Sequence, residues 1–144
     1  MGTSTDAKLA FGIDLGDELP EKMKAYLDEE GDECFDWGEF LSSLSDLQEP
    51  IGNDYQAPEW SAYWDKQSAF VKAFPLRMET HCSGDYPMYF LCINGTHIVA
   101  SRGETVAVST PDVSPEKIAI MREFCDKYGI EWQEPTWQIF SLWM

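Results

Sequence analysis

Two cysteine–histidine pairs have the residue types that catalysis would need. Cys92 and His97 lie on either side of a turn sequence, and His81 is followed directly by Cys82. Such a pair is the minimum for a thiol nucleophile, or half of a zinc site. In a strand, however, neighbouring side chains point to opposite faces, and Cys92 lies in an apolar run that favours burial. We therefore expect no enzymatic activity, with a small cysteine/histidine enzyme as an alternative.

No strong catalytic motif accompanies these pairs. The chain has no P-loop, dinucleotide fingerprint, G-x-S-x-G or H-E-x-x-H sequence. Its four cysteines show no C-x-x-C spacing, so we expect free thiols. We accordingly name no catalytic residue, no metal ligand and no cofactor.

The acidic stretch DEEGDECFDWGEF, residues 28–40, resembles the calcium loop of an EF-hand. The match runs through Asp28, Glu30 and Asp32 as side-chain ligands, Cys34 at the backbone-carbonyl position, Phe35 at the apolar position, then Asp36, and Glu39 at the bidentate position. The sixth position is Glu33, where the loop needs glycine for its sharp turn. We interpret the stretch as an acidic loop, and a degenerate calcium-binding module at 28–39 is the alternative.

Negative charge is concentrated in this part of the chain. Between Asp14 and Glu59 there are 15 acidic residues against Lys22 and Lys24, a net charge of −13 out of −16 for the whole chain. Such a field repels nucleic acids and anionic membranes, and attracts basic protein surfaces. We expect a partner to contact the carboxylates of Asp17, Glu18, Glu21, Asp28, Glu29, Glu30, Asp32, Glu33, Asp36 and Glu39.

A β-hairpin is predicted at Asn94-Gly95. Two apolar runs, 87–93 and 96–101, flank this pair, which tolerates the positive φ angles of a two-residue type I′ turn. Such a turn would place Leu91 opposite Ile98 and Cys92 opposite His97.

The remaining apolar patterns alternate between strand and helix periods. They predict strands at 8–14, 76–82, 105–109 and 136–143, and helices at 19–27, 37–47, 58–74 and 115–128. We expect the aromatic stripe of the 58–74 helix to pack against the sheet. The fold class is α+β: one domain over 1–144, with an antiparallel or mixed sheet of about five strands, two main helices, and an acidic helical arm and linker over 15–58. No run of 18 apolar residues and no signal-like start occur, so we expect a cytoplasmic protein.

Four short phrases resemble a group of small proteins encoded by tailed bacteriophages. They are AFGIDLG, HCSGDYPMY, ASRG and PTWQIFSLW. The resemblance covers about two thirds of the chain and carries no catalytic residues. It implies a phage origin, and hence the host cytoplasm as the location.

The acidic charge and this resemblance together favour a non-enzymatic binding protein. Duplex DNA presents one charge per about 1.7 Å of its axis, and an array of carboxylates can occupy the same Arg and Lys sites on a protein. We therefore expect an inhibitor that imitates DNA and covers a basic surface on a host protein.

The first testable prediction concerns calcium. Because Glu33 obstructs the turn of the 28–39 loop, calorimetry with millimolar calcium should give no saturable heat. Micromolar binding that disappears in Glu39→Gln would contradict this interpretation.

Overall fold

Five strands form one mixed sheet in residues 5–26, 35–83 and 85–143, the part of the chain that the computed structural model describes. In chain order the elements are β1 (Thr5–Gly16), α1 (Glu21–Lys24), α2 (Trp37–Ser43), α3 (Pro58–Ala73), β2 (Leu76–Ser83), β3 (Pro87–Ile93), β4 (Ile98–Ala100), α4 (Pro115–Tyr128) and β5 (Thr136–Trp143). The strand order is β3-β2-β5-β1-β4, and β2 runs parallel to β5. The predicted α+β class is confirmed.

The sheet closes on itself through an additional pairing of β3 with β1. β1 and β2 each pair with both β3 and β5, so these four strands form a ring. The aromatic side chains of Phe90 and Phe140 stack across the interior of this closed sheet, with centroids 4.5 Å apart. They come from β3 and β5, which lie on opposite sides of the closed sheet. Together with Ala10 and Cys92 they form a small apolar core inside the closed sheet.

An ion pair also crosses this interior. Lys8 of β1 and Glu79 of β2 are both buried, and Lys8 Nζ lies 3.0 Å from Glu79 Oε2. Lys8 Nζ also donates to the carbonyl oxygen of Thr80 at 3.1 Å, and Arg77 Nε pairs with the other oxygen of Glu79. Charges taken out of water are stable only when they are paired and hydrogen-bonded. The network therefore requires β1 and β2 to face each other.

Gly12 permits the close approach of β1 and β3. A Cβ atom at this position would lie 2.0 Å from the carbonyl oxygen of Leu91 and 2.7 Å from Cys92 Cα. Both obstacles are backbone atoms, so any side chain here would force the two strands apart.

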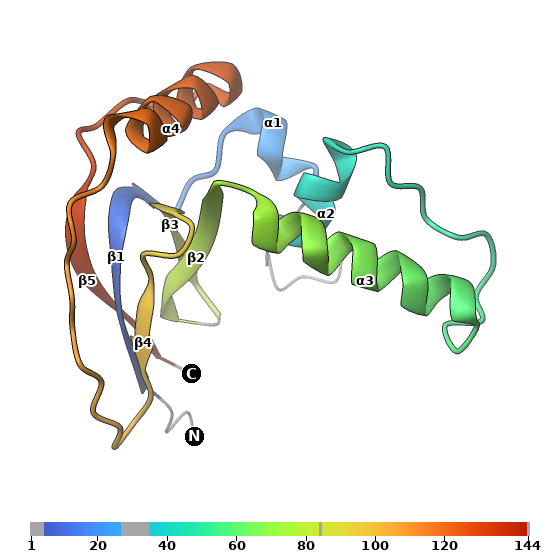
Figure 1. Ribbon diagram of the computed structural model, residues 1–144, viewed down its shortest axis with the longest axis horizontal. Coiled ribbons are helices and arrows are strands. Elements are labelled where there is room, and N and C mark those ends of the chain that lie inside the picture. Colours follow the sequence, from blue (N-terminus) through green and yellow to red (C-terminus); the bar gives the residue numbers. More distant parts are fainter. Residues whose placement is uncertain (1–4, 27–34, 84, 144) are drawn as a thin grey trace.

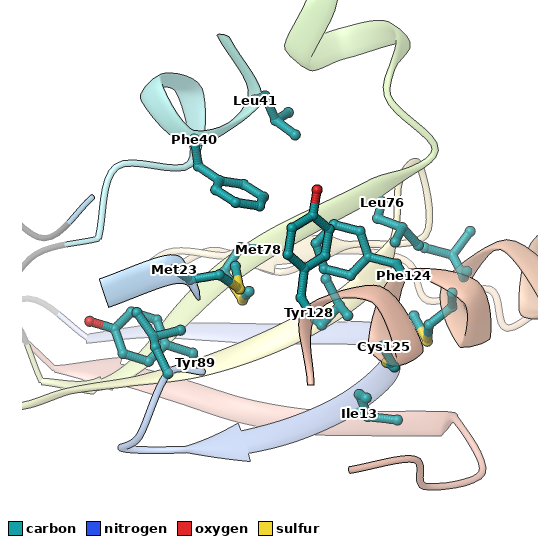
Figure 2. Packing of buried hydrophobic residues seen from close by; sticks show 14 residues of the cluster. Ile13, Met23, Phe40, Leu41, Leu76, Met78, Tyr89, Phe124, Cys125 and Tyr128 are labelled. Atoms are coloured by element: carbon teal, nitrogen blue, oxygen red, sulfur yellow. The ribbon is translucent and has the colours of Figure 1, made fainter. Parts of the chain in front are cut away.

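The main core lies on the outer face of β1, β2 and β3. α4 contributes Phe124 and Tyr128, α2 contributes Phe40 and Leu41, and α1 contributes Met23. Figure 2 shows the Phe40 ring pointing toward Tyr128, and their centroids are 5.2 Å apart at a T-shaped angle. The short helices of the acidic segment are therefore held to the sheet by buried apolar side chains, while their charged residues are exposed.

Most of α3 projects beyond the sheet, and its C-terminal end lies next to β2 (Figure 1). Its C-terminal end packs against the main core through Phe70, Val71 and the following Phe74. The aromatic residues of its first turns belong to neither buried cluster. The expectation that the whole aromatic stripe packs against the sheet is wrong for this half of the helix.

Helix ends follow their capping residues. Before α4, the Ser114 hydroxyl accepts a hydrogen bond from Lys117 N, and after it Gly129 takes a left-handed φ of +74°. α1 and α2 are shorter than predicted, and residue 27 lies outside the described residues. The strand predicted at 105–109 does not form, since this exposed segment has no ladder partner.

The predicted β-hairpin is also wrong. Within the described strands, β3 and β4 pair with β1 and not with each other, and both run antiparallel along the same edge of it. The observed pairs are Leu91 with Ile13, Cys92 with Gly12, and Ile98 with Leu9. The residues between β3 and β4 loop out opposite 10–11, where Thr96 Oγ1 accepts a hydrogen bond from Phe11 N at 3.2 Å.

The turn itself explains this outcome. Gly95 has a φ of +89°, but φ is not positive at Asn94, whereas a type I′ turn needs positive φ at both residues. The side-chain amide of Asn94 instead donates to the carbonyl oxygens of Lys72 and Phe74 at 3.0 and 2.8 Å. The turn is thus tied to the end of α3, and the 12-residue β1 provides an edge long enough for both strands.

The second prediction concerns the buried ion pair. Glu79→Leu should lower the free energy of unfolding by about 3–5 kcal/mol, because it leaves Lys8 buried without its counter-ion. Lys8→Met should cost less, about 1–3 kcal/mol, because Glu79 keeps its pair with Arg77. Urea denaturation of both single variants and the double variant measures this. The double variant should be more stable than Glu79→Leu, and the reverse order of the two single variants would contradict the argument.

Candidate functional site

Half of the carboxylates predicted to contact a partner lie in the described part of the chain. They are Asp17, Glu18, Glu21, Asp36 and Glu39, and all are exposed. The others, Asp28, Glu29, Glu30, Asp32 and Glu33, lie outside the described residues. The calcium-loop match at 28–39 therefore also falls largely outside them.

The structure brings the two described groups of carboxylates onto neighbouring elements. Asp36 N donates to the carbonyl oxygen of Tyr26 at 3.2 Å, and the Tyr26 ring contacts Phe40 with centroids 5.4 Å apart. These contacts hold the start of α2 beside the end of α1, as seen in Figure 1. The segments that bear the two described groups of carboxylates are thus neighbours in space.

Some of these carboxylates already have partners within the chain. Glu21 Oε1 accepts a hydrogen bond from Lys24 Nζ at 2.8 Å, and this bond raises the pKa of the Lys24 ammonium. The Asp36 carboxylate accepts the N–H of Glu39 and so caps α2. Asp17 and Glu18 line an open hollow of about 450 Å³ together with Lys24. An exposed ion pair such as Glu21–Lys24 contributes little stability, so a cationic group of a partner can replace Lys24.

Cys92 is poorly placed to act as a nucleophile. It lies inside the closed sheet, and burial, with the Glu79 carboxylate adding to the effect, raises the pKa of its thiol to about 12. Burial, and then the Arg77 guanidinium, lowers the pKa of His97. A neutral thiol and a neutral imidazole cannot form the thiolate–imidazolium pair that cysteine catalysis uses.

The other pair is separated by the strand. His81 Nε2 lies 3.0 Å from Asp14 Oδ1, and the ring packs 5.5 Å from Phe140. Cys82 is exposed and lines the hollow that contains Asp17 and Glu18. The two side chains therefore lie in different environments, as the alternation of a strand predicts.

An aromatic cluster at the far end of α3 was not predicted as a site. Trp60 is buried beneath Tyr55 and Trp64, with centroids 4.9 and 5.6 Å away, and Tyr63 contacts it from the helix at 5.8 Å. We call Tyr55, Trp60, Tyr63 and Trp64 the arm-tip cluster. The signal was present in the sequence: an aromatic residue in a polar linker, followed by two tryptophans four positions apart.

Comparison with protein-family models, curated proteins and solved structures found no match to the chain. Among the described helices, none is long and apolar enough to cross a membrane. The described residues also contain no group of three or more His, Cys, Asp or Glu side chains that could hold a metal ion.

The third prediction concerns thiol reactivity. In a Cys34→Ser background, Cys82 should react quickly with a disulfide reagent, and Cys92 and Cys125 slowly, because burial raises the pKa values of these two thiols to about 12 and about 11. At pH 8, about one thiol in 10⁴ with a pKa of about 12 is ionised. One fast thiol in the native protein and three in urea is the expected result of the absorbance assay. Fast native labelling of Cys92, located by mass spectrometry, would contradict its placement inside the sheet.

Proposed function

We propose that this chain is a non-enzymatic acidic binding protein of bacteriophage type, which acts in the host cytoplasm. It covers a basic surface of a host protein with carboxylates arranged as a substitute for DNA phosphates, and thereby inhibits that protein. The observation that carries the proposal is the partition of charge, with −13 of the net −16 lying between Asp14 and Glu59.

The described carboxylates are suited to this role. Asp17, Glu18, Glu21, Asp36 and Glu39 are exposed, whereas apolar residues of the same segment, such as Met23 and Phe40, are buried in the main core. The backbone that bears the charges is therefore attached to a folded body. A preorganised array loses less conformational entropy on binding than a free acidic tail does.

Salt dependence follows from the same picture. Exposed charges more than about 10 Å apart are screened at 0.1 M salt. Association that depends on the acidic segment should therefore slow and weaken as salt rises. Duplex DNA should compete for the same basic surface.

The fourth prediction neutralises the charges directly. A variant with Asp28→Asn, Glu29→Gln, Glu30→Gln, Asp32→Asn and Glu33→Gln should bind basic partners about tenfold or more weakly at low salt. Its melting temperature should stay the same or rise slightly, because repulsion between like charges is relieved. The measurement is interferometry against heparin-retained DNA-binding proteins of a bacterial lysate, with duplex DNA as competitor.

A matched control removes the same charge elsewhere. Neutralising Asp85, Asp112, Glu123, Asp126 and Glu131, all exposed residues outside the acidic segment, should leave affinity nearly unchanged. If the acidic-segment variant binds as tightly as the parent at low salt, the proposal fails.

A further inference from the structure

The arm-tip cluster lies well away from the main core. α3 rises about 1.5 Å per residue, so Trp60 lies about 20 Å along the helix from Phe74, whose ring packs on the core. Figure 1 shows α3 extending from the sheet and the segment before it returning to the far end of the helix. The cluster therefore stands on a projecting part of the molecule.

The cluster is only partly used in holding this projection together. Trp60 is 6% exposed and fastens the preceding loop to the helix, but Tyr55 is 56% and Trp64 43% exposed. The side chain of Ile51, in the same loop, is fully exposed. Exposed tyrosine and tryptophan on a rigid support are typical anchors of protein interfaces.

The exposed rings offer π systems to a ligand. The Tyr55 and Trp64 rings lie at 20° to each other with centroids 6.4 Å apart. The centroid of the buried Trp60 ring lies 4.9 Å from that of Tyr55 and 5.6 Å from that of Trp64. A cation within about 6 Å of such a face is attracted by the ring quadrupole. The body of this protein contains the same contact, where the Arg122 guanidinium lies 5.3 Å from the centre of Trp132.

The charges around the cluster are mostly negative. Residues 44–65 contain five acidic side chains and no lysine or arginine, and all five are exposed. Two of them, Asp54 and Glu59, line a hollow of about 560 Å³ with Ile51 and Trp60. The nearest basic residue along the chain is Lys66. A ligand that suits this surface carries positive charge on an apolar stem.

We infer that the arm-tip cluster, with the adjoining hollow, binds an arginine-bearing segment of a partner protein. The guanidinium lies against the exposed faces of Tyr55 and Trp64 and pairs with the carboxylates of Asp54 and Glu59, and its methylene stem covers the hollow. Arginine suits this arrangement better than lysine because its planar group both stacks on rings and forms bidentate carboxylate pairs. The inference rests on the proposed function and adds to it an anchor with a residue preference.

The fifth prediction tests the anchor with defined probes. Fluorescent peptides of about eight Arg, or about eight Lys, each alternating with Ser, are titrated with the protein at about 0.15 M salt and followed by anisotropy. The parent should prefer the Arg peptide. Tyr55→Ala/Trp64→Ala should weaken Arg-peptide binding by about tenfold and remove the preference. Tyr55→Phe/Trp64→Phe should keep most of both, because the π faces remain.

Two controls separate this contact from general stickiness and from unfolding. Tyr55→Leu/Trp64→Leu keeps apolar bulk without π faces, so it should bind like the double alanine variant. Ile139→Ala/Trp143→Ala removes comparably exposed apolar side chains from β5 and should change nothing. Far-ultraviolet circular dichroism checks that α3 remains folded in each variant. Parent-like binding by Tyr55→Leu/Trp64→Leu would overturn the arginine assignment.

The outcomes distinguish this inference from the proposed function. If the variant neutralised at 28–33 loses binding and the Tyr55/Trp64 variants keep it, the proposed function is supported and the arm-tip anchor is overturned. If the ring variants weaken binding and the neutralised variant does not, the anchor stands alone. If the parent shows no preference for the Arg peptide, the inference is overturned.

Discussion

The buried pair of Lys8 and Glu79 sets the constraint on which the rest of the fold depends. Its charges come from strands on opposite sides of a four-strand ring, and a charge is stable inside a protein only when it is paired and hydrogen-bonded. The pair therefore disfavours any open arrangement of the sheet. Phe90 and Phe140, stacked in the same interior, add apolar contact to the same closure.

Closure of the ring determines where the helices can lie. With the interior filled, the outer faces of β1, β2 and β3 remain to be covered, and α4 covers them together with the short helices of the acidic segment. α3 contributes only its C-terminal end to this cover, and Asn94 ties that end to the turn between β3 and β4. The first turns of α3 are left to form a separate aromatic cluster with the preceding loop.

Our two proposals assign two surfaces of the molecule to one kind of partner. One is the set of exposed carboxylates around α1 and α2, which offers negative charge. The other is the arm-tip cluster, which offers ring faces and a hollow beside further carboxylates. Charge steers the encounter of two proteins, whereas buried aromatic anchors carry most of the affinity. The two surfaces would thus act at different stages of the same association.

The sequence alone determined the features that depend on local chemistry. Ser114 and Gly129 predicted the ends of α4, and the period-2 patterns predicted β1, β2 and β5. The concentration of carboxylates before Glu59 is likewise a property of the sequence. These predictions succeed because caps, turns and periodicity act over a few residues.

Only the tertiary structure decided which strands pair and which aromatic residues are buried. Asn94-Gly95 favours a hairpin locally, yet β1 offers β3 and β4 a longer common edge, and contacts far apart in sequence override the turn preference. Trp64 and Phe74 follow the same helical stripe, but Trp64 is exposed and Phe74 packs on the core, because only the C-terminal end of α3 reaches the core. In the sequence Lys8 looks like an ordinary strand lysine, and only closure of the sheet places it opposite Glu79. Pairing, burial and closure depend on the whole chain, so they could not be read from its separate segments.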